Sequence, residues 1–544
     1  MLPSIDSERS GQPSSVPRQE RPRVAPVEGD IAHLGGRVLA LSVAAFVATY
    51  TIVDPDLWGH LRFGLDTLVA RQLTATDPYS FTQDMPWINH EWLSEVILAG
   101  AWRAGGVVGI VLMKAAVLSG TFALLAHTVR RNIPPAYRWW MLALTIAAVT
   151  PSANTIRPQL WTLLGLAYLG WTLWGSEDGR LEGHRRLSPN LGALPLLFLF
   201  WANLHGGWIV GLGVASSWLV GKLLDELVQT QATGPSRHAA LIRLGAVLIV
   251  SVATTLINPY GLQLWRFLGS TVGVGREITE WRPLWQQTSI SIPVLWLATS
   301  TAAAAAAKKV GVKQIPWSAA LPTLGLGVMS AFVARLVPLF AEITLLASAG
   351  AWALGKASLP TTEASSVAPG TGTAQTTRRA MGPQQFLVVD FSIAAAIVAA
   401  NLFLVSRCLP VTGDWVPDLQ AAGALAPSTV QGRLILPFDW GQFAIWHYGP
   451  RLRVSTDGRR ETVYSDAAVR LQAGVANGTA SGLAYLERER PEYLWFPSDT
   501  GAATGTWLET NGYRIDVRTR RSFIARRADL PALTVGHPFA ACFP

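Results

Sequence analysis

The chain has 544 residues, of which half are apolar and only 15% are charged, against roughly 25% charged residues in a soluble domain. This composition excludes an ordinary soluble globular protein and predicts an integral membrane protein. The net charge of +9 does not indicate a nucleic-acid partner, because the basic pairs stand between apolar runs, as short cytoplasmic loops require. These pairs are Arg130-Arg131, Arg185-Arg186, Lys308-Lys309 and Arg378-Arg379.

The chain opens with a polar tail and continues as a series of apolar runs. Residues 1–33 are rich in Ser, Pro, Arg and Glu, so we expect a disordered cytoplasmic tail and no cleavable signal peptide. A membrane helix needs roughly 20 apolar residues, and about eleven runs qualify. We therefore predict an α-helical polytopic membrane protein with a transmembrane domain over 34–355. The runs lie near 35–53, 107–129, 138–153, 157–175, 192–204, 207–228, 240–257, 290–307, 317–334, 336–355 and 385–406.

The first exit from the membrane carries two carboxylates, Asp54 and Asp56, in the first extracytoplasmic loop, 54–92. Carboxylates at a membrane boundary are costly unless they face water or a site, so we expect them at the lip of an outward-facing cavity. Asp56 is the preferred catalytic base, with Asp54 second. The alternative is that one of them caps the following helix, 57–71. The apolar residues of that helix recur at helical spacing, which predicts a helix along the membrane surface.

Other unusual polar residues fall on the same predicted side of the membrane, and ionisable groups at this depth usually mark substrate paths. Glu91 is a second candidate carboxylate, and His90 is its partner or a metal ligand; simple hydrogen bonding is the alternative. Arg157 and Arg335 suit phosphate, because guanidinium matches phosphate oxygens with two bonds, although Arg157 could also snorkel to the interface. The substrate-binding candidates are His60, Asn89, His90, Arg157, Gln159, Asn203, His205, Glu280, Arg282 and Arg335.

The C-terminal quarter has a different character. A flexible cytoplasmic linker is expected over 356–384, then a last membrane helix over 385–406, then an extracytoplasmic α/β domain over 407–544. Asp457 and Arg459 could border an acceptor site or form a turn with a surface ion pair. Cys408 and Cys542 could form a disulfide or remain unpaired thiols. The expected strands are 433–438, 452–455, 492–496 and 513–517, and the expected helices are 461–473 and 481–490.

Six motifs follow one another along the chain: Asp-Pro-Asp-x-Trp-Gly-His, Trp-x-Asn-His-Glu-Trp, Arg-Pro-Gln, Asn-Leu-His-Gly-Gly, Asp-Trp-Gly and Asp-Gly-Arg. Taken in order, they resemble a bacterial family of multispanning proteins similar to the GT-C superfamily of glycosyltransferases, which includes protein mannosyltransferases and oligosaccharyltransferases. The resemblance runs from about Asp54 to Asp529, and it implies a polyprenyl-phosphate-linked sugar donor and an acidic base in the first outer loop. Carried over, that base is Asp56, although Asp-Pro-Asp only approximates the paired acidic motif of some relatives.

The resemblance leads to a membrane-embedded glycosyltransferase that moves a sugar to an extracytoplasmic glycan, lipid or protein by inverting displacement. The expected location is the inner (plasma) membrane, with the N-terminus cytoplasmic and the C-terminal domain outside, among membrane lipids. No cofactor is assigned, and a divalent metal is left open. The alternatives are a lipid or polysaccharide transporter or flippase, and a non-catalytic membrane protein that binds envelope polymer.

Overall fold

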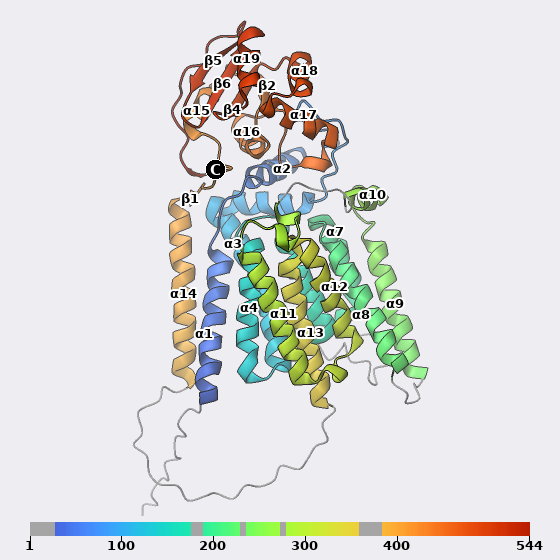
Figure 1. The fold of residues 1–544 in the computed structure, drawn as a ribbon. Helices are drawn as coiled ribbons and strands as arrows, with labels where there is room; N and C mark the ends of the chain where they lie inside the picture. Colours follow the sequence, from blue (N-terminus) through green and yellow to red (C-terminus); the bar gives the residue numbers. More distant parts are fainter. Residues whose placement is uncertain (1–27, 75, 176–188, 229–234, 272–278, 358–382) are drawn as a thin grey trace, which may run out of the picture.

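The structure is a computed structural model that describes residues 28–74, 76–175, 189–228, 235–271, 279–357 and 383–544. Figure 1 shows a bundle of roughly parallel helices with a compact mixed domain above one end. Residues 358–382 of the predicted linker and residues 1–27 of the predicted tail lie outside the described residues, while α1 already begins at Glu28. The bundle contains α1(Glu28–Thr49), α3(Trp92–Asn132), α4(Pro135–Ala153), α5(Leu160–Gly170) with η1(Trp171–Gly175), α7(Leu194–Leu204), α8(Trp208–Val228), α9(Pro235–Thr254), α11(Ser291–Val310), α12(Trp317–Phe332), α13(Val337–Ala357) and α14(Pro383–Arg407).

Each predicted apolar run contains a helix, but the described helices do not all meet the same criterion for a membrane span. By length and composition, three are long and apolar enough to cross a membrane, in the ranges Trp92–Asn132, Trp208–Val228 and Ala334–Leu354. The predicted number of about eleven spans therefore stays a prediction. The shorter apolar helices are Leu34–Thr49, Asn190–Leu204, His238–Thr254, Trp317–Phe332 and Phe391–Arg407.

Short helices lie at the upper end of the bundle in Figure 1, where the chain passes between spans. The helix α3 is interrupted at Gly105 and Gly106, where the backbone leaves helical geometry. Gly106 has a φ of 55°, a conformation that glycine adopts without a Cβ clash. The remaining elements of the bundle region are α2(Leu57–Ala70), α6(Pro189–Gly192), α10(Leu262–Thr271), η3(Thr279–Trp281), η4(Leu284–Gln286), η5(Val312–Gln314) and η6(Ala334–Leu336).

Helix α2 corrects the prediction of a membrane-surface helix. Its apolar residues Leu57 and Leu61 are fully buried, and they belong to a hydrophobic core that also includes residues of α3 and of the C-terminal domain. Figure 1 shows α2 between the bundle and that domain. Helical periodicity shows that a helix has an apolar face, but the same face can meet lipid or protein. Here it meets protein.

The C-terminal domain is built on a five-stranded sheet with strand order β3-β2-β4-β6-β5. The predicted strands are present as β2(Gly432–Ile435), β3(Leu452–Val454), β4(Tyr493–Pro497) and β5(Tyr513–Arg518), and the prediction missed β6(Ser522–Arg527). The predicted helices are present as α17(Asp466–Asn477) and α18(Ala480–Glu489). Further elements are β1(Leu409–Pro410), α15(Leu419–Ala422), η7(Gly423–Leu425), η8(Phe438–Trp440), α16(Gly441–Tyr448), η9(Arg460–Thr462), α19(Ala502–Thr510) and β7(Cys542–Phe543).

The first outer loop adds itself to the edge of this sheet. Ser80 pairs with Val454 of β3 in parallel register, and the Val454 N–H donates to the Tyr79 carbonyl at 2.9 Å. Further along, the Ser465 N–H donates to Asp84 Oδ1 at 2.7 Å. These bonds satisfy an edge strand that would otherwise expose its backbone groups. They also join two segments that lie far apart in the sequence.

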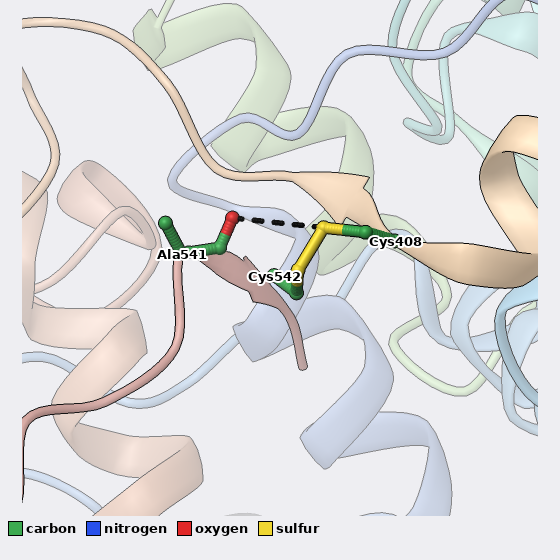
Figure 2. Close-up of a disulfide and its surroundings, with 3 residues drawn as sticks. All are labelled: Cys408, Ala541 and Cys542. Atoms are coloured by element: carbon green, nitrogen blue, oxygen red, sulfur yellow. Dashed lines mark hydrogen bonds between the residues drawn. A yellow bond between two sulfur atoms is a disulfide. The ribbon is translucent and has the colours of Figure 1, made fainter.

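The two cysteines, whose pairing the sequence left open, form a disulfide between Cys408 and Cys542. Cys408 follows the end of α14, and Cys542 lies in β7, which pairs with β1 in antiparallel register. Figure 2 shows the bridge beside Ala541, whose carbonyl oxygen lies 3.9 Å from the Cys408 sulfur. The last strand of the chain is thereby fixed next to the helix that enters the domain.

Candidate active site

The acidic pair after the first helix is held by one arginine. Arg157, between α4 and α5, places Nε 2.9 Å from Asp54 Oδ2 and Nη2 3.0 Å from Asp56 Oδ2. The contact between Arg157 Nε and Asp54 Oδ2 is an ion pair, but its geometry is not that of a hydrogen bond. Asp54 Oδ1 accepts the backbone N–H of Asp56 at 2.8 Å. The acidic pair and the distant arginine therefore form one cluster, which excludes simple snorkelling as the role of Arg157.

The two carboxylates differ in their surroundings. The side chain of Asp54 is 9% exposed, and that of Asp56 is 24% exposed. Burial raises the pKa of Asp56, the charge of Arg157 lowers it and the charge of Asp54 raises it, with the balance above the usual range. Although Asp56 occupies the N-cap position of α2, its side chain makes no capping hydrogen bond. The capping alternative therefore does not account for Asp56.

His60, one turn into α2, connects this cluster to the start of α3. His60 Nδ1 lies 3.1 Å from Glu95 Oε1, and Asn89 Nδ2 donates to Glu95 Oε2 at 2.6 Å. Burial lowers the pKa of His60, but the hydrogen bond to Glu95 and the charges of Glu91 and Glu95 raise it, to about 9 overall. At neutral pH His60 is therefore a cation paired with a buried carboxylate. It adds positive charge to the acidic end of the site.

A pocket opens beside this cluster. Its polar lining residues are His60, Glu95, Arg157 and Ser94, whose hydroxyl accepts the Trp161 N–H at 3.0 Å. Charged, polar and apolar side chains therefore share the lining of this pocket. The apolar lining residues are Leu98, Met113, Val117, Ile156, Pro158, Leu160 and Trp161.

Glu91 lies between two histidines. Its Oε1 is 3.6 Å from His90 Nε2 and 3.7 Å from His205 Nε2. Burial raises the pKa of Glu91, but the positive charges of its neighbours, His90 first, lower it below the usual range. Burial lowers the pKa of His205 to about 4, so His205 is neutral at neutral pH. Glu91 is therefore an ionised carboxylate, which suits electrostatic contact better than proton abstraction.

The proton on His205 can be placed from its hydrogen bonds. The Gly207 N–H donates to His205 Nδ1 at 3.1 Å, so in the neutral ring Nδ1 accepts and the proton is on Nε2, toward Glu91. The Thr162 hydroxyl lies 2.7 Å from the same Nδ1. A Cβ on Gly207 would lie 2.1 Å from Thr162 Oγ1, which explains the glycine in the Asn-Leu-His-Gly-Gly motif.

Arg335 contacts residues near the start of α5 and in the segment before α11. Its Nη2 donates to Gln159 Oε1 at 3.0 Å, and its Nη1 lies 3.4 Å from Glu280 Oε2. The Glu280 side chain is 54% exposed, so this ion pair is only weakly held. Arg335 also lies 5.8 Å from the ring centre of Trp281. The neighbouring Arg282 is exposed, and its backbone carbonyl accepts the Ala334 N–H at 3.3 Å.

Asn203 is nearby but is engaged by protein. Its Oδ1 accepts the Trp92 Nε1–H at 3.0 Å, and its Nδ2 donates to the carbonyls of Leu199 and Ile257 at 2.8 and 2.9 Å. These bonds tie the end of α7 to α3 and to the segment after α9. An amide with its donors and acceptor satisfied in this way serves packing. Asn203 is thus held by packing contacts, whereas Arg157 contacts Asp56 and Arg335 contacts Gln159.

The C-terminal domain closes onto the first loop through a buried arginine, Arg459. Its guanidinium forms two bonds to Asp77, at 2.7 and 2.9 Å, and two to Asp457, at 2.8 and 2.6 Å. The aromatic rings of Phe63, Tyr79 and Trp87 surround it at 4.9 to 5.3 Å. This is neither of the predicted roles, because Arg459 is only 8% exposed and therefore neither a surface pair nor an open acceptor contact.

Two ionisable residues inside spanning helices escaped the sequence reasoning. Lys114 of α3 is fully buried and donates to the Tyr50 carbonyl, just past the end of α1. Glu342 of α13 is fully buried, and its carboxyl group has no hydrogen-bond partner among the described residues. A charge inside an apolar run is a visible signal, and both could have been found that way.

A divalent metal remains without a site in the described part of the chain. Within those residues, no group of three or more His, Cys, Asp and Glu side chains could hold a metal ion. His90, which the sequence offered as a metal ligand, lies instead beside Glu91 and against the ring of Phe267, at 5.4 Å between ring centres.

Comparisons with known proteins identify the fold. No family model matches the chain, and no curated protein matches it. Among solved structures, the archaeal oligosaccharyltransferase AglB from Archaeoglobus fulgidus, in complex with an inhibitory peptide and a dolichol-phosphate, matches with a TM-score of 0.52 at 11% identity, over 92% of this chain and 75% of that one. ArnT from Cupriavidus metallidurans in the apo state matches with a TM-score of 0.50 at 11% identity, over 91% and 97%. The chain therefore shares its overall fold with these two proteins, in agreement with the resemblance of its motifs to the GT-C superfamily.

Proposed function

We propose that this protein is a membrane-embedded glycosyltransferase that moves a sugar from a polyprenyl-phosphate donor to an acceptor outside the cytoplasm, by inverting displacement. The observation that carries the proposal is the Asp54–Arg157–Asp56 cluster beside a pocket, at one end of a GT-C fold. The N-terminus would be cytoplasmic in an inner (plasma) membrane, and the pocket would open on the outer side. The acceptor is a glycan, a lipid or a protein.

Asp56 is the proposed base. The acceptor oxygen would attack the anomeric carbon while its proton passes to the Asp56 carboxylate. The bond from the anomeric carbon to the phosphate oxygen would break, and the electron pair would leave with polyprenyl phosphate. Burial supports this role, because it raises the pKa of Asp56 and so increases its basicity. The 24% of its side chain that stays exposed leaves a path for the acceptor.

Arg335 is the better candidate for the leaving phosphate. Arg157 is paired with two carboxylates, of which Asp54 is nearly buried, so withdrawing it would leave buried charges without a partner. Arg335 has one exposed acidic partner, Glu280, which a phosphate dianion can replace at low cost. We therefore assign Arg157 to organising the acidic pair and Arg335 to stabilising charge on the phosphate.

The test uses the purified full chain in liposomes with a panel of polyprenyl-phosphate sugars carrying a labelled sugar. Release of polyprenyl phosphate and labelled product is expected for at least one donor. Asp56→Asn should lower the rate by about 100-fold or more, in the range for loss of a general base. The matched control is Asp66→Asn on the same helix, whose carboxylate pairs with Arg62 at 2.7 Å.

Two results would contradict the proposal. If Asp56→Asn releases product at the native rate, then Asp56 is not the base. If no donor is consumed but labelled lipid crosses the bilayer, a transporter or flippase is the better description. The buried groups Lys114 and Glu342 are the first residues to test in that case, because ionisable groups inside spans line transport paths.

A further inference from the structure

The C-terminal domain contacts the proposed base directly. A Cβ built on Gly458, in the Asp-Gly-Arg motif, would lie 2.0 Å from Asp56 Oδ1 and 2.4 Å from Gln442 Nε2. Asp56 Oδ1 and Gln442 Nε2 therefore lie close to the position that a Cβ of residue 458 would occupy. They fit there only because residue 458 has no side chain. The backbone at 458 is thus in van der Waals contact with the carboxylate, and a larger residue would displace it.

Gln442, in the Asp-Trp-Gly-Gln segment, completes this contact. Its side chain is buried, and a Cβ on Gly59 would lie 2.0 Å from its Oε1. Among the described residues, that oxygen has no hydrogen-bond partner. A buried amide that leaves an acceptor unsatisfied is costly and requires a reason beyond stability. The Gln442 side chain therefore runs between the helix that follows Asp56 and the backbone of Gly458, with its amide nitrogen near Asp56 Oδ1.

The rest of the interface fixes this arrangement. Gly441 packs on the same turn, since its Cβ would lie 2.1 Å from the Thr456 carbonyl oxygen. Arg459, next to Gly458, is held by Asp77 and Asp457. Trp58, two residues after Asp56, lies in edge contact with Phe443, with 5.4 Å between ring centres. The turn that carries Gly458 is therefore packed against Gly441 on one side and held by the Arg459 ion pairs on the other.

We propose that Gln442 and Gly458 are positioning residues that set the rotation of the Asp56 carboxylate from the side of the C-terminal domain, an inference that rests on the proposed function of Asp56 as base. Arg157 holds Oδ2 from the membrane side. Gly458 and Gln442 limit Oδ1 from the other side, so one rotation of the carboxylate is favoured. Precise placement of a reacting group is worth large factors in rate, and a shift of about 1 Å can cost about 100-fold.

The test measures kcat, donor KM and the pH profile of the full chain in liposomes. Gln442→Met keeps the volume and removes the amide, so kcat should fall by about tenfold or more while KM changes little. Gln442→Glu places a carboxylate beside Asp56, which should raise the pKa of Asp56 and move the acidic limb of the profile to higher pH. Gly458→Ala should lower kcat further, although it is less diagnostic because it also crowds the fold.

The shift can be assigned to Gln442 only against the other charges that face Asp56. These are Asp54 on the same loop, His60 on α2, Glu91 before α3 and Arg157 between α4 and α5. None of them changes in the Gln442 variants. The matched control is Gln472→Glu, which adds the same charge in the same domain, at a residue bonded to Tyr485 at 2.8 Å. It should leave the pH profile at the native position.

Failure of this inference and failure of the proposed function give different results. Suppose that Asp56→Asn is inactive, that Gln442→Met keeps the native kcat and that Gln442→Glu keeps the native pH profile. The positioning role is then wrong, and the assignment of Asp56 as the base stands. If Asp56→Asn is itself active at the native rate, Asp56 is not the base. The positioning role of Gln442 and Gly458 is then also wrong, because it depends on that assignment. A lowered kcat in Gln442→Met together with an upward pH shift in Gln442→Glu would support both.

Discussion

The membrane bundle and the C-terminal domain hold the same carboxylate in different ways. On the bundle side, Asp56 meets charge, through Arg157 at 3.0 Å and the nearby Asp54, His60 and Glu91. On the domain side it meets an uncharged surface, the backbone of Gly458. The first contact controls the pKa of the group, and the second controls its orientation. Variants on the two sides should therefore fail in distinguishable ways.

The largest effect is expected on the bundle side. Arg157→Met leaves two carboxylates without a cation, and breaking such a pair costs about 3–5 kcal/mol in buried sites. The apparent melting temperature in detergent should fall, and any remaining activity should show its acidic limb at higher pH, because loss of a positive charge raises the pKa of Asp56. Arg157→Lys keeps the charge and should recover part of the stability. A native pH profile in Arg157→Met would show that Arg157 does not control the pKa of Asp56.

The domain side is tested by Arg459→Met. The side chains of Asp77 and Asp457 are fully buried at this pair, so removing the guanidinium should cost about 3 kcal/mol or more. Limited proteolysis should then release the C-terminal domain faster, and activity should fall without a shift in the pH profile. Arg433→Met is the control. Arg433 pairs with Glu489 at 3.8 Å, but the Arg433 side chain is 43% exposed, so this ion pair should contribute less than about 1 kcal/mol to stability.

The pH dependence of stability gives a third test. The pKa of His60 is raised to about 9, so its pair with Glu95 stabilises the fold fully below the usual histidine pKa and progressively less as pH rises through 9. The loss between about pH 6.5 and pH 9 should be on the order of 3 kcal/mol. Melting curves against pH will show it, and His60→Gln should flatten them. His537→Gln, at an exposed histidine, is the control and should leave these curves unchanged. If the melting temperature of the native protein does not change with pH in this range, the pairing of His60 with Glu95 is contradicted.

The smallest effect on stability is expected at the ion pair of Arg335. Glu280→Gln removes an exposed partner of Arg335 and should change stability by less than about 1 kcal/mol. The change should nevertheless lower the donor KM severalfold, because a phosphate no longer competes with a carboxylate for the guanidinium. Initial rates against donor concentration will measure this. An increase in KM would place the phosphate elsewhere.

Much of this arrangement follows from the sequence because it depends on which end of a helix a residue occupies. Asp56, Arg157 and His205 each lie next to the end of a predicted apolar run, and alternation of the runs brings those ends to one side. The structure places Arg157 in contact with Asp56, and it places Glu91 near His205. The helix bounds agree closely at α8, predicted over 207–228 and observed over Trp208–Val228, whereas α3 begins at Trp92, well before the predicted run 107–129.

The contacts between the first loop and the C-terminal domain could not be predicted in the same way. An Asp-Gly-Arg segment reads equally well as an exposed turn, and nothing local shows that Arg459 meets Asp77 or that Gly458 meets Asp56. The strand β6 carries Arg526 and Arg527 at its end, so its pattern does not alternate as a half-buried strand should. Such features depend on packing between distant segments, which periodicity does not report.

The closeness of Gly458 to Asp56 has a consequence for biosynthesis. On the topology proposed above, a chain made from its N-terminus inserts the loop that carries Asp56 early, whereas the turn that carries Gly458 would be exported only after the last helix, α14, has entered the membrane. Until that domain has crossed and docked, the carboxylate lacks one of its two supports. A partly assembled molecule would therefore not consume donor lipid. Catalytic activity would begin only when the C-terminal domain has docked and the fold is complete.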